Sequence, residues 1–181
     1  MADSTQQPPI LILHELDLRS RRFAHALPQR IEVKSTREGI GLRLGELSLV
    51  VPMDQVKEIL THVTVSRIPG AKEWVRGVAN VRGNLLPILD LNGFIFGKVS
   101  KMNRHSRVLV MQHQGVIAGL VVTEVMGMRH FFEEEFDSDV SQMNATIQPL
   151  LSGVFRQGGE AWGVLDIHKL VDIPEFMQVA A

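Results

Sequence analysis

The sequence contains no cysteine among its 181 residues. This absence excludes disulfide bonds, thiolate nucleophiles and zinc sites with sulfur ligands. A chain of this kind fits a reducing compartment, so we expect a cytoplasmic protein. Its hydrophobic content of 45% and charged content of 22% are ordinary for a folded globular chain, which excludes a largely disordered one.

Aromatic side chains are scarce, at 6% of the residues, and tyrosine is absent. The two tryptophans, Trp74 and Trp162, lie far apart in the sequence, so they predict no platform for stacking nucleic-acid bases. Lysine and arginine number 19 against 20 aspartates and glutamates, which leaves a formal charge of -1. This balance argues against a broad phosphate-neutralising face, and we therefore expect no nucleic-acid partner.

Long apolar runs are also missing. The run nearest to the start, residues 10–13, holds only four residues, and the basic residues follow it instead of preceding it. A secretory signal peptide has the opposite order, and a membrane span needs about 18 unbroken apolar residues. We expect neither a signal peptide nor direct insertion into a membrane.

Motifs for catalysis, metals and cofactors are not found. The histidines show no HxH or HExxH spacing, and the sequence has no GxSxG, GxGxxG or Walker pattern. Asp90, Asp166 and Glu124 each end a predicted strand, where capping of a following short helix accounts for each of them separately. We therefore expect no catalytic residue, no metal ion and no cofactor. The scattered histidines are His14, His25, His62, His105, His113, His130 and His168.

Residues 10–27 place apolar side chains at helical spacing, with arginines mostly on the other side, and Pro28 ends the pattern. This spacing predicts an amphipathic N-terminal helix. Such a helix would serve either as a strut on the main body or as a docking helix for a partner. The next stretch, residues 28–39, is polar and typical of a linker.

After the linker the apolar period shortens to that of β-strands. Apolar runs separated by glycine-containing turns predict hairpins at 41–52, 107–125 and 153–171. We expect each hairpin to lead into a short helix, as over residues 53–60, and we expect a surface loop over 133–149. Further strands are predicted at 63–68, 75–81 and 85–90. About nine or ten short strands predict an all-β chain built of small barrels or a sandwich.

The stretch GVANVRGNLLPILDL, residues 77–91, interrupts two apolar runs with a compact polar segment. Gly83 supplies the backbone freedom for a hairpin turn there. Pro87 cannot donate to a strand ladder, which predicts a sheet edge or a bulge, and Asp90 could cap a following helical turn. Taken alone, Arg82 is most simply a solvated side chain. A rigid hairpin, however, would present its guanidinium to carbonyls or a carboxylate of another protein.

The segment IPGAKEWVRGVANVRGNLLPILDL, residues 68–91, resembles the signature of CheW-type adaptors, which couple chemoreceptors to a histidine kinase in bacterial chemosensory arrays. The resemblance covers residues 38–174. The N-terminal helix and the late segment GVFRQGGEAWGV resemble most the branch that controls type IV pili and twitching motility. The matching residues are Ile68, Pro69, Gly77, Val78, Asn80, Arg82, Gly83, Pro87, Asp90 and Leu91.

The resemblance implies two small five-stranded SH3-like β-barrels around a shared hydrophobic core, and no enzymatic activity. It implies two partners: the coiled-coil hairpin tip of a methyl-accepting chemoreceptor, and the regulatory domain of a CheA-type histidine kinase, which would bind barrel to barrel. The residues assigned by analogy to the receptor-facing groove are Val56, Glu58, Ile59, Asn80, Arg82 and Gly83. We interpret Gly77, Pro87 and Asp90 as turn or cap residues.

We divide the chain into an N-terminal helix and linker, residues 1–38, a CheW-like domain, 39–174, and a C-terminal tail, 175–181. Thr123 departs from the family pattern, which usually has aspartate there, and the N-terminal residues have no counterpart in minimal members. Contacts near both are therefore left open. For such an adaptor we expect recruitment from the cytoplasm to membrane receptor arrays.

Other functions stay open at this point. The same adaptor role could belong to flagellar chemotaxis. A rival from another class is a small-ligand sensor with the seam between the barrels as its pocket, or an enzyme with Asp90 and Asp166 as a carboxylate pair.

Overall fold

The structure is a computed structural model that describes residues 8–23, 35–113 and 115–178. The chain divides into two compact units, Met1–Val33 and Lys34–Ala181. In the first unit, helix α1 spans Pro9–Phe23, and a proline suits the first turn of a helix, where its missing N–H would have no partner in any case. The end of the predicted helix and most of the predicted linker, residues 24–34, lie outside the described residues.

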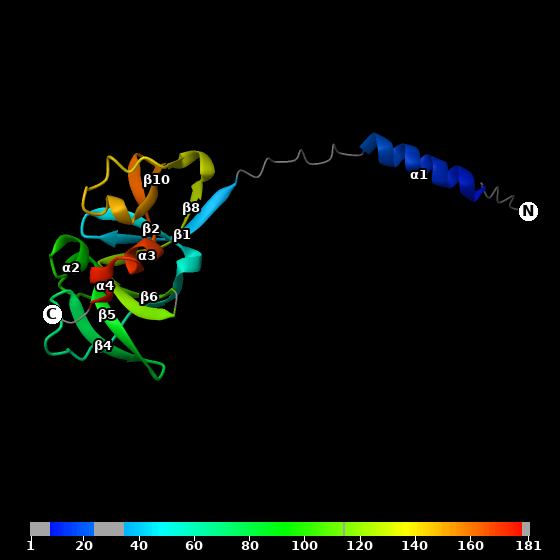
Figure 1. The fold of residues 1–181 in the computed structure, drawn as a ribbon. Helices are drawn as coiled ribbons and strands as arrows, with labels where there is room; N and C mark the ends of the chain where they lie inside the picture. The colour runs from blue at the N-terminus through cyan, green and yellow to red at the C-terminus, as the bar shows by residue number, and fades with distance from the viewer. Residues whose placement is uncertain (1–7, 24–34, 114, 179–181) are drawn as a thin grey trace, which may run out of the picture. The chain divides into compact units, whose positions relative to one another are not determined.

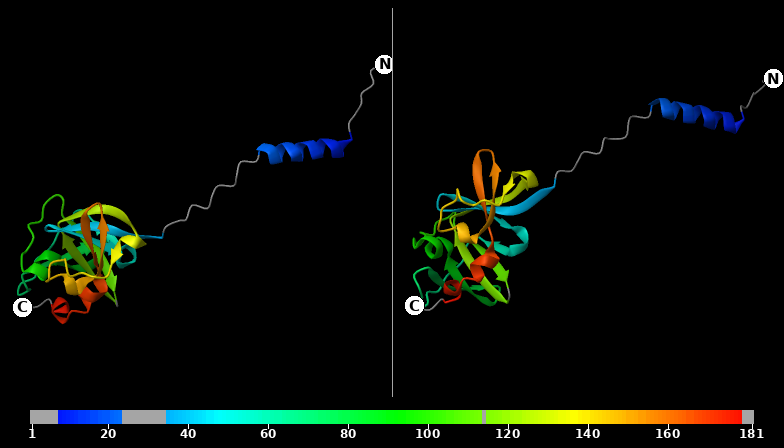
Figure 2. Two further views of the ribbon diagram at one scale, coloured as in Figure 1. Left: turned by 90° about the horizontal axis from the view of Figure 1, so that it is seen from above. Right: turned by 45° about the horizontal axis from the view of Figure 1, so that its top comes forward.

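The second unit contains two β-sheets, which form separate halves in Figure 1 and in the right-hand view of Figure 2. The first sheet contains β1 (Thr36–Leu44), β2 (Leu47–Pro52), β8 (Glu124–Phe132), β9 (Phe136–Asp137), β10 (Leu151–Gln157) and β11 (Glu160–Leu165). These six strands lie in the order β8-β1-β2-β11-β10-β9. Neighbours are antiparallel except for β2 and β11, which are parallel.

The second sheet contains β3 (Val56–Leu60), β4 (Val75–Val81), β5 (Asn84–Asp90), β6 (Arg107–His113) and β7 (Val116–Val122). These five strands lie in the order β3-β6-β7-β5-β4. Here too one pair is parallel, β5 with β7, and the others are antiparallel. Each sheet is therefore built around a hairpin whose second strand runs parallel to a neighbour.

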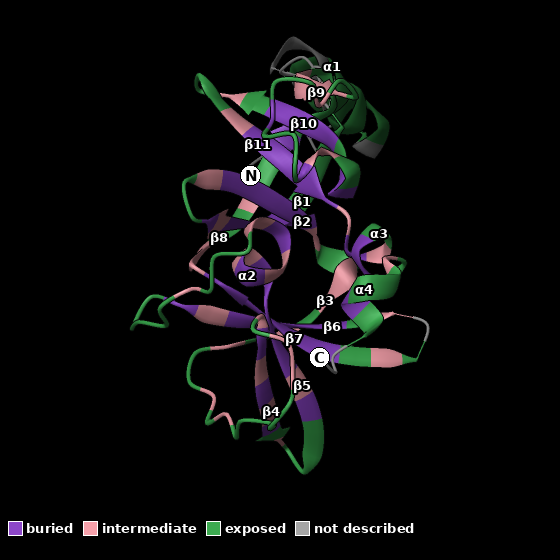
Figure 3. Cartoon of the chain, turned by 60° about the vertical axis from the view of Figure 1, so that its left-hand side comes forward, coloured by how far each residue is buried: buried purple, intermediate pink, exposed green. Residues whose placement is uncertain are grey.

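Short helical segments lie between the strands and after the last of them. The α-helices are α2 (Leu91–Phe96), α3 (Ile167–Val171) and α4 (Pro174–Met177), and the 3₁₀ turns are η1 (Met53–Gln55), η2 (Glu133–Glu135) and η3 (Gln148–Leu150). Helix α2 follows the β4–β5 hairpin and α3 follows the β10–β11 hairpin, each started by an aspartate cap. Figures 1 and 3 show α2, α3 and α4 at the level where the two halves meet.

Three apolar clusters form the interior of the second unit, and Figure 3 shows the buried residues concentrated on the strands. The largest cluster is shared by the two sheets and includes Leu49 of β2 and Leu109 of β6. A second cluster, around Ile88, belongs to the five-stranded sheet. The third, around Phe131 and Trp162, belongs to the six-stranded sheet. Each half thus has an interior of its own and contributes a second face to a common core.

Strand β6 shows why some apolar runs are unbroken. Val108 and Val110 belong to the cluster of the five-stranded sheet, whereas Leu109 and Met111 belong to the shared cluster. Because alternate residues point to opposite faces, both faces of this strand are buried. A small sheet that curls around its own core and also packs against a second sheet needs apolar side chains on both of its faces.

Residues 53–60 do not form the predicted helix. The first three residues make the 3₁₀ turn η1, and the rest form β3, which pairs antiparallel with β6. Apolar residues at positions 56, 59 and 60 fit a helical and a strand pattern equally well over so short a stretch. The segment forms a strand because it pairs with β6.

Two other strand predictions need correction. The strand predicted at 63–68 is reduced to a single bridge, in which Ser66 pairs with Val78. The hairpin predicted to end at residue 125 continues directly into β8 instead of a short helix, because β8 pairs with β1 along nearly its whole length. The predicted unit of hairpin and helix is confirmed at 153–171, as β10–β11–α3, and a further such unit occurs at β4–β5–α2.

The acidic segment 133–149 is more than a surface loop. It contains η2 and β9, and Ile147 and Met143 are 0% and 9% exposed within the shared cluster. Glu133 accepts hydrogen bonds from the guanidinium of Arg37 on β1, so the acidic run is not simply solvated. Polar residues dominate this stretch, and its two buried apolar side chains show no periodic pattern.

The compact unit, Lys34–Ala181, extends beyond the predicted domain, residues 39–174, at both ends. Strand β1 begins at Thr36, within the predicted linker, because these polar residues pair with β8. At the other end, α4 lies partly in the predicted tail and buries Phe176, which is 2% exposed. Its ring stacks on Trp74 at 5.9 Å and meets the edge of Phe94 at 5.2 Å. The tail therefore completes the core.

Candidate partner-binding site

The β4–β5 hairpin ends in a two-residue turn made by Arg82 and Gly83. Both residues have positive φ, 52° for Arg82 and 85° for Gly83, as in the type I′ turns that suit the twist of a hairpin. The side-chain oxygen of Asn80 accepts a hydrogen bond from the N–H of Gly83 at 2.9 Å. We call residues 80–85 the hairpin tip. Figure 3 shows it at the far end of the five-stranded sheet, almost entirely exposed.

Arg82 is the one non-glycine residue with a positive φ among the described residues. A positive φ is unfavourable for a residue with a Cβ, and such positions are common where a side chain must be held in a set place. The Arg82 side chain is 78% exposed, and its Nη2 donates to Oε1 of Glu58 at 2.5 Å. The guanidinium thus projects into solvent from a fixed backbone, with a carboxylate as its partner.

The partner, Glu58, lies on β3, and its side chain is 26% exposed. In the sheet order, β3 and β4 are opposite edges separated by three strands. An ion pair between β3 and the end of β4 therefore means that the sheet curls into a barrel and brings its two edges together. Because Arg82 is so exposed, the pair contributes only about 0.2 to 1 kcal/mol to stability. Its main effect is to hold the guanidinium in place.

The two apolar residues predicted with Glu58 lie in different surroundings. Ile59 is 37% exposed next to Glu58. Val56 is half-buried and packs against the shared cluster. The structure therefore brings Glu58 to Arg82 and Asn80 to Gly83, gives Ile59 an exposed position, and places Val56 against the core.

Gly77 lies in a β-bulge of β4 and not in a turn. Its φ is 135°, and a Cβ at this position would clash with the backbone oxygen of Ser66. The N–H of Val78 donates to that oxygen at 2.9 Å, and the N–H of Ser66 donates to the carbonyl of Val78 at 2.8 Å. Glycine thus lets the preceding loop press against the base of the hairpin, which stiffens it.

Pro87 lies on an internal strand and not, as predicted, at a sheet edge, because β5 runs between β4 and β7. Its partner on β4 is Val78, and the ladder with β7 begins one residue later, at Ile88. A proline is tolerated here because no bond to β7 is lost at its position. The bulge of this hairpin lies on β4, between residues 75 and 77.

Asp90 anchors the other end of the hairpin and is 0% exposed. Its carboxylate accepts from the N–H of Gly93 at 3.0 Å, which caps α2, and from the N–H and hydroxyl of Ser100 at 2.6 and 3.0 Å. Nη1 of Arg76 lies 3.8 Å from Oδ2 of Asp90. This buried carboxylate is therefore fully paired and ties β5, α2 and the following segment together.

Sequence reasoning did not single out Leu85, and it left the contacts of Thr123 open. Leu85 is 74% exposed on the hairpin tip opposite Asn80, while Leu86 is 5% exposed. Strict alternation along β5 separates the two leucines, and that signal was available in the sequence. Thr123, at the end of β7, accepts from the N–H of Gly45 through its hydroxyl at 3.0 Å, which joins it to the β1–β2 turn.

Among the described residues, Arg37 and Asp139 have shifted pKa values. The hydrogen bond to Glu133 raises the pKa of Arg37. Hydrogen bonds from the N–H and hydroxyl of Ser141 lower the pKa of Asp139. Arg37 lies on β1 and Asp139 just after β9, so both shifts belong to the half of the molecule without the hairpin tip.

Asp90 and Asp166, the carboxylate pair of the enzyme hypothesis, cap two different helices. Asp166 accepts from the N–H of His168 at 3.0 Å and caps α3, as Asp90 caps α2. Within the described ranges, no group of three or more histidines, aspartates or glutamates is placed to hold a metal ion. The same residues include no helix long and apolar enough to cross a membrane.

Comparison with known protein families accounts for this arrangement. The family described as the CheW-like domain matches residues 38–175. The chain belongs to the CheW-like domain family. The matched range contains Glu58, the hairpin tip and both capped helices.

Named relatives of this CheW-like chain differ in how much of it they cover. Protein PilI of Pseudomonas aeruginosa is 42% identical over 177 residues, which is 98% of this chain and 99% of PilI. Protein FrzA of Myxococcus xanthus is 27% identical and covers 82% of this chain and 94% of its own length. Chemotaxis protein CheW of Helicobacter pylori is 25% identical over 73% of this chain and 79% of its own length.

A solved CheW structure shares the fold. The scaffolding protein TtCheW from Thermoanaerobacter tengcongensis matches with a TM-score of 0.67 at 20% identity, over 77% of this chain and 95% of that one. The predicted class, two small SH3-like β-barrels with a shared core, is confirmed. One sheet has six strands instead of five, because the two-residue β9 extends it. As a CheW-like protein, this chain is a scaffold of chemosensory signalling.

Proposed function

We propose that this chain is a non-enzymatic adaptor that couples a methyl-accepting chemoreceptor to a CheA-type histidine kinase in a pathway controlling type IV pili and twitching motility. The adaptor acts in the cytoplasm and is recruited to membrane receptor arrays through the receptor. The receptor-facing groove is formed by residues of β3 and the hairpin tip: Val56, Glu58, Ile59, Asn80, Arg82 and Gly83.

The observation that carries the proposal is the fixed exposure of Arg82. Its backbone is set by the two-residue turn, its side chain is 78% exposed, and Glu58 holds the guanidinium from the opposite edge of the curled sheet. The guanidinium has five N–H donors on a planar group, and those not engaged by Glu58 can bind carbonyls and carboxylates of a helical hairpin. A donor group held in place beforehand loses little entropy on binding.

Exposed apolar side chains on the hairpin tip and on β3 support a protein partner. Leu85 and Ile59 are 74% and 37% exposed; Leu85 pairs with Asn80 on the hairpin tip, and Ile59 follows Glu58 on β3. Apolar side chains around a central arginine are typical of interface cores. We assign Leu85 to the receptor-facing surface for this reason.

An adaptor needs two partners to be bound at once. Binding to the receptor turns the encounter with the kinase into an intramolecular one, so modest affinity at each face is sufficient. In this proposal the kinase regulatory domain binds barrel to barrel, away from the hairpin tip. Co-purification with the candidate receptor and the candidate kinase, singly and together, tests the proposal. Recovery of all three proteins in one complex supports it, and failure to retain either protein contradicts it.

The twitching branch is favoured by the extent of the similarity to PilI. That similarity covers 98% of this chain, whereas the match to chemotaxis protein CheW of Helicobacter pylori covers 73%. Deletion of the gene is expected to abolish twitching and leave swimming unchanged in a strain that does both. Loss of swimming with normal twitching would instead assign the adaptor to flagellar chemotaxis.

The seam between the barrels does not favour a small-ligand sensor. Side chains from both sheets fill it, including Leu49, Leu109 and Leu165, each no more than 1% exposed. A thermal-shift screen with metabolites separates the two hypotheses, since a ligand of the folded state raises the melting temperature. The adaptor proposal expects no large specific shift.

A further inference from the structure

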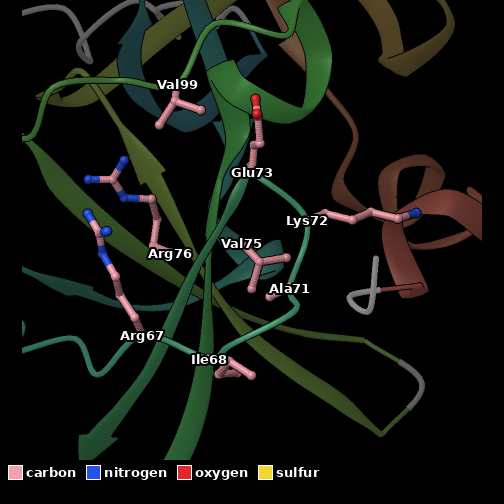
Figure 4. A pocket seen from close by; sticks show the side chains of 8 residues that line it. All are labelled: Arg67, Ile68, Ala71, Lys72, Glu73, Val75, Arg76 and Val99. Atoms are coloured by element: carbon pink, nitrogen blue, oxygen red, sulfur yellow. The ribbon is translucent and has the colours of Figure 1, made fainter.

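A pocket of about 360 Å³ lies at the end of β4 remote from the hairpin tip (Figure 4). It is formed by the loop before β4, the first residues of β4 and the segment after α2. The residues that line it are Arg67, Ile68, Ala71, Lys72, Glu73, Val75, Arg76 and Val99. None of these residues belongs to the receptor-facing groove proposed above, so the pocket is a separate site.

Two arginines dominate one side of the pocket. Figure 4 shows the side chains of Arg67 and Arg76 lying alongside each other and projecting in the same direction, while Lys72 and Glu73 point elsewhere. Like charges held side by side repel each other, and an anion placed between them removes this repulsion. A carboxylate suits two guanidinium groups particularly well, because each group offers a pair of parallel N–H donors.

Arg76 is held in position by the protein. Its Nη1 donates to the carbonyl of Ser100 at 3.2 Å and lies 3.8 Å from the buried carboxylate of Asp90. Its side chain is only 23% exposed. Arg67 is exposed, and no ion pair of its side chain occurs among the described residues. The pocket therefore combines a fixed guanidinium with one that is available for a ligand.

Apolar side chains adjoin the two arginines. Ile68 and Val99 are each 41% exposed in the same pocket. A free inorganic anion would not cover them, whereas a peptide carrying an apolar residue next to an acidic one would. We propose that this pocket binds an acidic peptide segment of a partner protein, with a carboxylate between Arg67 and Arg76 and a neighbouring apolar side chain against Ile68 and Val99.

The test uses the full chain and blocked tripeptides as probes. The side-chain Nε–H signals of Arg67 and Arg76 are followed by nuclear magnetic resonance while acetyl-Leu-Glu-Leu-amide is added. The glutamine counterpart, acetyl-Leu-Gln-Leu-amide, and sodium phosphate are added in parallel at matched ionic strength. We expect saturable shifts of both signals with the glutamate peptide below about 10 mM, and binding about tenfold weaker or more with the glutamine peptide.

Matched variants control for the position of the charge. Arg67→Glu should weaken binding of the glutamate peptide by about tenfold or more, because one of the two donor groups is replaced by a like charge. Arg104→Glu makes the same charge change at an exposed arginine outside the pocket and should leave binding unchanged. Arg76 is not substituted, since it contacts the buried Asp90 and its loss would also disturb the fold.

Several results would overturn the proposal. The first is the absence of saturable shifts with the glutamate peptide while circular dichroism shows a folded protein. Equal binding of phosphate and peptide would mean a free-anion site. A dimer in sedimentation equilibrium that Arg67→Glu dissociates without any peptide would mean that a second copy of this chain fills the pocket. None of these outcomes depends on receptor binding at the hairpin tip.

Discussion

Charge reversal at Arg82 should separate binding from folding. In Arg82→Glu, the ion pair with Glu58 is lost and two carboxylates face each other across the barrel edge. Because Arg82 is 78% exposed, the lost pair contributes only about 0.2 to 1 kcal/mol, and the new repulsion is of similar size. Domains of this kind have a free energy of unfolding of about 5 to 15 kcal/mol. The variant should therefore fold, with a melting temperature lower by only about 2 to 4 °C per kcal/mol.

Receptor binding should respond far more strongly than folding. If the guanidinium is desolvated and hydrogen-bonded in the complex, its loss leaves receptor groups unpaired and costs about 2 to 5 kcal/mol. This corresponds to a dissociation constant about 30-fold to 4,000-fold larger. Isothermal titration calorimetry with a receptor hairpin-tip fragment measures the change, and circular dichroism measures the fold.

A charge-swapped variant makes this test stricter. Glu58→Arg combined with Arg82→Glu restores an internal ion pair but places the cation on β3 instead of on the hairpin tip. We expect this double variant to regain stability and not receptor binding. Arg104→Glu serves as the control for a change in net charge. Wild-type affinity in Arg82→Glu, with an unchanged circular dichroism spectrum, would refute the role given to Arg82.

Three further substitutions, one of them with a matched control, test the site and the core. Gly77→Ala introduces a Cβ against the backbone of Ser66 at a φ of 135°. Urea denaturation should therefore show a free energy of unfolding lower by about 1 to 3 kcal/mol or more. An unchanged denaturation midpoint would contradict the close approach between residue 77 and Ser66. Phe176→Ala empties a position that is 2% exposed and should cost about 3 to 5 kcal/mol in the same assay, whereas Met177→Ala, 46% exposed, should change stability by less than about 0.5 kcal/mol. Leu85→Ser, at a position 74% exposed, should leave the melting temperature nearly unchanged and weaken receptor binding in calorimetry; equal affinity would remove Leu85 from the receptor-facing surface.

The hairpin that carries the site was largely predictable from the sequence. Gly83 marks its turn, and alternation along β4 gives the buried positions Val75, Gly77 and Ala79. The aspartate after β5 predicts the capped helix α2. These are local rules, in which a residue and its near neighbours contain the information. Such rules predict the strands, turns and helices, but they do not predict how far apart these elements lie in the folded chain.

Contacts between distant segments were not predictable in this way. Glu58 meets Arg82 only because the sheet curls until its two edges adjoin. The family resemblance implied a barrel and placed both residues in one groove, but the local sequence patterns did not give the ion pair between them. The apolar pattern of residues 53–60 fits a helix as well as a strand, and only the pairing of residues 56–60 with β6 distinguishes the two. Ile147 and Phe176 are buried within short polar segments, where two or three apolar residues form no detectable period.

Simultaneous binding of both partners is the central claim, and analytical ultracentrifugation of the chain with a receptor hairpin-tip fragment and the kinase regulatory domain tests it most directly. We expect one sedimenting species that contains all three proteins, and expect Arg82→Glu to reduce it to a complex of chain and kinase domain. If the receptor fragment displaces the kinase domain from the wild-type chain, the two occupy the same surface and this chain does not couple them.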